Sequence, residues 1–143
     1  MRKLSLSMFA LAVAAVIAAG PVLGATSTKK TVTAKLTGAQ EVPKGSPAGS
    51  GHARVTLDST KGQVCFTLAW SKIKPPSASH IHKGAKGKAG PVVIAFFTSA
   101  PAKHSGCVSA PKSTIAAIIK TPGAYYVNIH TSDYPAGAIR GQL

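Results

Sequence analysis

The stretch HARVTLDSTKGQVCFTLAW, residues 52–70, has the pattern of two β-strands separated by a turn. Apolar and polar residues alternate in both halves, and alternation with a period of two is typical of strands that bury one face. Lys61 and Gly62 supply the turn between them. The pattern therefore predicts an antiparallel hairpin. Its core-facing residues are expected to be Ala53, Val55, Leu57, Val64, Phe66, Leu68 and Trp70.

The rest of the chain continues in short extended segments divided by Gly, Pro and Ser. One segment, residues 113–120, instead places isoleucines at helical spacing and ends before Pro122-Gly123. About seven strands, one short helix and no alternation of strands with helices predict an all-β sandwich or barrel. Besides the hairpin, the expected strands cover residues 31–37, 79–82, 91–98, 125–131 and 138–143.

The N-terminus has the layout of a secretory signal peptide. Arg2 and Lys3 precede an apolar segment, and the small residues Gly24 and Ala25 follow it. The alternative is a membrane anchor, since about 20 apolar residues span a bilayer. Gly20-Pro21 interrupts the apolar segment before the apparent cleavage site, which favours cleavage. We therefore expect a signal peptide at residues 1–25, a single domain at residues 26–143, and no transmembrane segment after cleavage.

The chain is strongly basic, with a net charge of +14. Removing Arg2 and Lys3 leaves 15 basic residues against three acidic ones, which is a net charge of +12. Such a domain attracts anionic polymers of the cell envelope, although its lysines are scattered and also fit a solvated basic surface. Export argues against nucleic acid as the natural ligand.

Cys65 and Cys107 are the two cysteines, and both lie in the expected domain. In a small exported protein such a pair usually forms a disulfide. Thiolate ligation of a metal is the alternative, but neither cysteine has a second one nearby. The disulfide supports a secreted, periplasmic or cell-envelope location.

Several phrases resemble the CHRD domain, a module first described in chordin and also found in exported bacterial proteins. The resemblance covers nearly the whole expected domain, in the family's order. It implies an immunoglobulin-like β-sandwich with distant similarity to Cu/Zn superoxide dismutases, but no defined biochemical role. The matching phrases are LTGAQEVP (36–43), GSGHARVTLDSTKGQVCFTL (49–68), ASHIHKGAKGKAGPVV (78–93), SGCV (105–108) and YYVNIHTSDYPAGAIRGQL (125–143).

Three histidines are the best candidates for chemistry. Positions two apart in a strand share a face, so His80 and His82 point together while Ile81 points into the core. The same rule places His130 on the outer face with Tyr126 and Asn128. If the two strands are neighbours, the three imidazoles converge outside the sandwich.

Three imidazole nitrogens with an open position suit copper or zinc. Asp133 is expected to orient an imidazole from behind, and Arg140, with the lysines of residues 83–90, to make the approach positive. The alternative is purely structural, with the histidines holding the neighbouring loop through hydrogen bonds. His52 and His104 are expected on the surface.

Glu41 is one of only three acids, and we expect it to make a salt bridge or loop hydrogen bond, with Arg54 or Arg140 as partners. The few acids do not assemble a carboxylate pair, and no serine stands in a nucleophile elbow. A superoxide dismutase would need further histidines for a second metal, so we expect no enzyme. Two hypotheses remain: an exported copper- or zinc-binding module, or a basic envelope module that binds an anionic polymer or a protein.

Overall fold

The computed structural model describes residues 28–143, so the predicted signal peptide lies outside the described residues. The described residues are mostly β-sheet with one short α-helix, which confirms the predicted all-β fold. The strands are β1 (Lys29–Thr37), β2 (Ser50–Asp58), β3 (Gln63–Ser71), β4 (Ala78–Lys83), β5 (Val92–Phe97), β6 (Ser105–Ser109), β7 (Tyr125–His130) and β8 (Ile139–Gln142). The helices are α1 (Lys112–Lys120) and two 3-10 turns, η1 (Gly38–Gln40) and η2 (Pro122–Ala124).

Seven of these strands fall on the predicted segments, and the hairpin of residues 52–70 is the β2–β3 pair. Strand β6 was not predicted, because its sequence SGCVS contains one β-branched residue, Val108, and no run of apolar alternation. The segment is nevertheless a strand, because every one of its residues pairs with a residue of β3.

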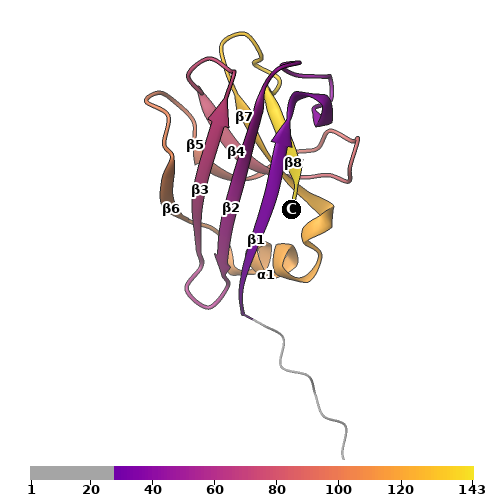
Figure 1. Ribbon diagram of the computed structural model, residues 1–143. Helices are drawn as coiled ribbons and strands as arrows, with labels where there is room; N and C mark the ends of the chain where they lie inside the picture. The colour runs from indigo at the N-terminus through magenta and orange to yellow at the C-terminus, as the bar shows by residue number, and fades with distance from the viewer. Residues whose placement is uncertain (1–27) are drawn as a thin grey trace, which may run out of the picture.

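All strand pairs are antiparallel, in the order β5-β4-β7-β8-β1-β2-β3-β6. The contact between β8 and β1 is a single register pair, Thr37 with Arg140. The sheet therefore bends there into two four-stranded layers that face each other (Figure 1).

The core lies between the two layers. Ile81 on β4 and Val55 on β2 are both fully buried, and the rings of Phe66 and Phe96 stack across the layers with centroids 4.4 Å apart. Helix α1 covers one end of the core with Ile115, Ile118 and Ile119 (Figure 1). In the described part of the chain, no helix has the length and hydropathy needed to cross a membrane.

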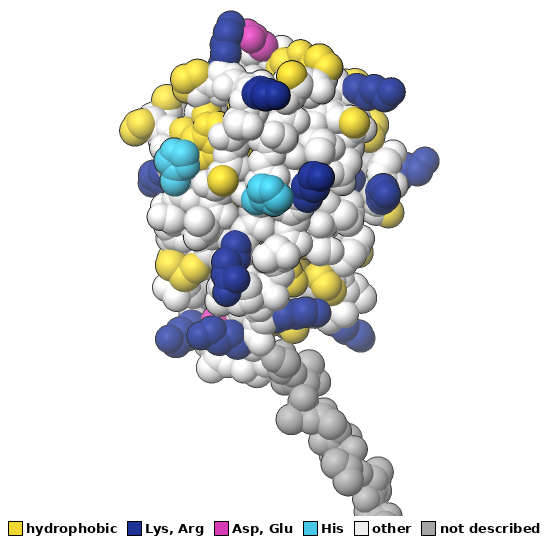
Figure 2. Space-filling model, in the orientation of Figure 1, with side chains coloured by type: hydrophobic (Ala, Val, Ile, Leu, Met, Phe, Trp, Pro, Cys, Tyr) yellow, Lys and Arg dark blue, Asp and Glu magenta, His cyan; other side chains and the backbone are white. Residues whose placement is uncertain are grey.

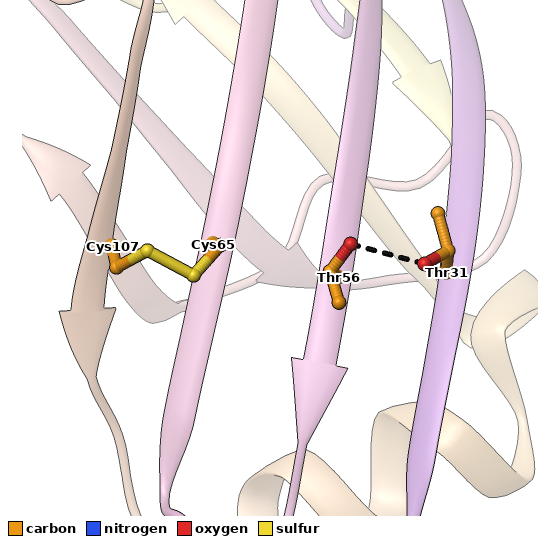
Figure 3. Close-up of a disulfide and its surroundings, with 4 residues drawn as sticks. All are labelled: Thr31, Thr56, Cys65 and Cys107. Carbon is orange, nitrogen blue, oxygen red and sulfur yellow. Dashed lines mark hydrogen bonds between the residues drawn. A yellow bond between two sulfur atoms is a disulfide. The ribbon is translucent and has the colours of Figure 1, made fainter.

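The predicted disulfide is present. Cys65 on β3 and Cys107 on β6 are direct register partners, and their bridge lies on the outer face of the layer (Figure 3). In the same row across the layer, the hydroxyls of Thr31 and Thr56 are hydrogen-bonded at 3.0 Å. The bridge thus fastens the end strand β6 to the hairpin.

Candidate metal centre

Strands β4 and β7 bring the three predicted histidines together. The strands pair so that Ala78 lies opposite His130 and His80 opposite Asn128. Ile81 and its neighbours Val127 and Ile129 are fully buried in the core. Alternation therefore turns His80, His82 and His130 to the outer face of this layer, as the sequence predicts.

The ring nitrogens are close enough to share an ion. One nitrogen from each ring lies within 4.8 Å of the others, and His80 Nδ1 is 3.2 Å from His130 Nε2, at hydrogen-bond distance. Nitrogens that bind one tetrahedral ion at about 2.0–2.1 Å lie roughly 3.3 Å apart. The closest pair meets this spacing, and the third nitrogen lies within 4.8 Å of both.

Loop carbonyls fix which nitrogens are free. His82 Nδ1 donates a hydrogen bond to the carbonyl oxygen of Gly90 at 2.8 Å, and His130 Nδ1 donates to that of Pro135 at 2.9 Å. A neutral imidazole that donates from Nδ1 has its lone pair on Nε2. The Nε2 of His82 is buried and has no hydrogen-bond partner. The site therefore presents an uncompensated buried lone pair, and an imidazole lone pair is a donor that copper and zinc accept.

The electrostatic environment keeps two of the rings neutral. Burial, with the nearby His130 and His82, lowers the pKa of His80 to about 4. Burial also lowers the pKa of His130, against the opposing effect of the Pro135 carbonyl. Neutral imidazole is the form that binds a metal. At neutral pH these two rings therefore do not have to release a proton before an ion can bind.

Asn128 adds a polar group beside the histidines. Its side chain is 2% exposed, and its Oδ1 is 3.1 Å from His130 Nε2. Because both atoms are acceptors when His130 donates from Nδ1, this contact is a hydrogen bond when the amide turns its NH₂ group to the ring. Sequence parity placed Asn128 on this face but gave it no role.

A stack of flat side chains supports His82 from behind. Its ring lies parallel to that of Tyr126 at 4.8 Å, and the Arg140 guanidinium lies 3.3 Å from the centroid of the Tyr126 ring. The Tyr126 hydroxyl accepts a hydrogen bond from the Gly90 N–H. Together with the His82–Gly90 bond, this fixes the ring orientation at the site.

Arg140 is expected to make the approach to the histidines positive, but its side chain is buried. It is 2% exposed, and its guanidinium donates to the carbonyls of Ala85 and Lys88 in residues 83–90, here called the lysine loop. Burial is also the main cause that lowers the pKa of Arg140. The arginine therefore anchors the lysine loop over the sheet and does not receive anions from solvent.

Asp133 also differs from its expected role. It accepts a hydrogen bond from the Lys74 Nζ at 2.7 Å on the exposed surface. The carbonyl of Pro135, rather than this carboxylate, orients His130. The sequence could not reveal this, because the choice depends on how the loop between β7 and β8 folds back.

The remaining candidates lie elsewhere. His52 and His104 are exposed, as expected, and His104 stacks on Trp70 with centroids 4.0 Å apart. Glu41 is buried and makes a loop hydrogen bond with the Val42 N–H. Arg140 attracts its carboxyl group through space, but the Oε1 of Glu41 has no hydrogen-bond partner.

Comparison with known proteins places the chain in a family. The model of the CHRD domain matches residues 32–143, which is most of the chain and includes all three histidines and both cysteines. No curated protein and no solved structure matches it. The chain belongs to the CHRD domain family.

Proposed function

We propose that this CHRD-domain protein is an exported, non-enzymatic module that binds one copper or zinc ion through His80, His82 and His130. The observation that carries the proposal is the buried Nε2 of His82, which has no partner within a cluster of three imidazoles. A purely structural role accounts for the Nδ1 atoms that hold loop carbonyls. It leaves this lone pair unexplained, and an unsatisfied buried polar atom costs about 1–3 kcal/mol.

The donor set favours copper or zinc over hard cations. All three donors of the cluster are imidazole nitrogens, whereas Mg²⁺ and Ca²⁺ prefer oxygen ligands. Both cysteines are in the disulfide and are not available as thiolates. A bound ion would be held for buffering or delivery, with the fourth position open to an exchange partner.

Export is supported by the disulfide. Such bonds persist in oxidising compartments, and this one joins two strands of the domain. With the basic and apolar N-terminal segment, it supports a signal peptide at residues 1–25 and a secreted, periplasmic or cell-envelope location for residues 26–143.

Metal titration tests the function. The purified metal-free protein should bind about one equivalent of Cu²⁺ or Zn²⁺ with a Kd below micromolar, measured by calorimetry and by metal analysis after gel filtration. The variant His80→Ala/His82→Ala/His130→Ala should lose this binding and keep its circular dichroism spectrum. His52→Ala, which removes an exposed histidine on the other layer, should bind as the wild type does. Binding weaker than micromolar in the wild type, or equal binding in the triple variant, rejects the proposal.

A further inference from the structure

The outer face of the β1–β2–β3–β6 layer is a flat array of small and cationic side chains. Register pairing puts Lys35 beside His52, and Thr33 beside Arg54, with Thr67 next in that second row. We call these five residues the cationic face. Figure 2 shows this side of the molecule, with Lys, Arg and His side chains spread among small side chains and backbone.

The positive charge of this face is not neutralised by the chain's own acids. There are three acids: Glu41 is buried in the loop after β1, and Asp133 is bonded to Lys74. Asp58, at the far end of β2, accepts a hydrogen bond from the backbone N–H of Lys61. In Figure 2 acidic side chains are visible only near the upper and lower ends of the face. Lys35 and Arg54 therefore project a positive field into solvent.

The shape of the face suits an extended ligand. The five residues, with Ala69 and the strand backbones, line a shallow hollow of about 350 Å³. Diagonal neighbours on adjacent strands, such as Lys35 and Arg54, are about 7–8 Å apart. A linear chain with repeated negative groups can contact both cations and the threonine hydroxyls at once.

The two outer faces of the molecule differ in how they are covered. On the β4–β7–β8 layer, the lysine loop is held over the sheet by Arg140 and Gln142, whose side chains bond its carbonyls. The cationic face is lined by strand residues alone. We propose that the cationic face is a binding site for a linear polyanion, separate from the histidine cluster on the opposite layer.

A matched pair of double variants tests the location. The probe is long-chain inorganic polyphosphate, with polygalacturonate as the carboxylate counterpart, and binding is followed by fluorescence anisotropy at several salt concentrations. Lys35→Gln/Arg54→Gln should weaken binding of the full chain about five- to twentyfold. Loss of two ionic contacts should also lower the slope of log K against log salt by roughly 1–2. Lys86→Gln/Lys88→Gln removes the same charge from the lysine loop and should change the affinity less than twofold.

Each other outcome overturns the proposal. Equal weakening in both double variants would mean that net charge alone binds the polymer. Stronger weakening in the lysine-loop variant would move the site to that loop. Binding to phosphatidylglycerol vesicles without binding to either soluble polymer would identify a membrane surface instead. The triple histidine variant should bind polyphosphate normally, so this test is independent of the metal site.

Discussion

The carboxyl group of Glu41 packs against Gly137, the residue two before β8. Gly137 has a φ of 138°, and a Cβ atom there would collide with the carboxyl group, so this position requires glycine. Burial raises the pKa of Glu41 from 4.5 to about 7, against the attraction of Arg140 and the Val42 N–H. Between pH 4.5 and 7 the folded protein therefore holds a proton that the unfolded chain has released.

This linkage predicts the pH dependence of a Glu41→Gln variant. Because the folded state binds more protons in that window, the contribution of Glu41 to the free energy of unfolding falls as pH rises. The stability of the wild type relative to Glu41→Gln should decrease by about 2–3 kcal/mol from pH 4.5 to pH 8. Urea unfolding at each pH measures this difference, and the effect of the lowered His80 pKa is common to both proteins and cancels. A difference independent of pH would mean that Glu41 has the same pKa in the folded and unfolded chains.

For single residues, the sequence predicts which side chains face outward but not which groups form hydrogen bonds with them. Strand parity predicts the outward direction of His80, His82 and His130, because parity is a local property, but their convergence also needs the pairing of β4 with β7. The partners of their Nδ1 atoms are the carbonyls of Gly90 and Pro135. Every residue has a backbone carbonyl, so the sequence does not mark these two as partners. The contacts depend on how the loops fold.

Among the elements, β6 is a strand that its own sequence does not predict and that its neighbour β3 holds in place. It is short, lies at the end of the sheet and pairs only with β3. The Cys65–Cys107 bridge joins the two strands in the middle of their pairing. The sequence predicts this bridge through the cysteine count, although the pattern of residues 105–109 gives no strand.

Removing the bridge should therefore be costly. Cys65→Ser/Cys107→Ser opens a loop of 42 residues, and the chain-entropy model predicts a loss of about 4 kcal/mol in the free energy of unfolding. Thr31→Val, in the same row across the layer, removes an exposed hydrogen bond to the Thr56 hydroxyl and should cost less than about 1 kcal/mol (Figure 3). Urea unfolding compares the two variants. A loss below about 1 kcal/mol in the double cysteine variant would show that strand pairing alone holds β6.

For the whole molecule, the sequence predicts two facing layers but not how they join. The joint is the pairing of β8 with β1, the last and first strands of the described residues, through Thr37 and Arg140. Thr37 and Arg140 are far apart in sequence, and such pairing has no local pattern, so only the fold reveals it. The joint is narrow, but the shared core between the layers, including the Phe66–Phe96 stack, couples them.

This coupling predicts that metal at one layer stabilises the other. Trp70, the single tryptophan, lies on β3, in the layer opposite the histidines. Its fluorescence reports unfolding of that layer, whereas far-ultraviolet circular dichroism reports all strands. Free Zn²⁺ at 100 times its Kd should raise the free energy of unfolding by about 2.7 kcal/mol, because it binds only the folded state. Both signals should shift together to higher urea, and neither should shift in the triple histidine variant. If the circular dichroism signal shifts while Trp70 fluorescence does not, the layers unfold separately, and the core does not make the molecule one cooperative unit.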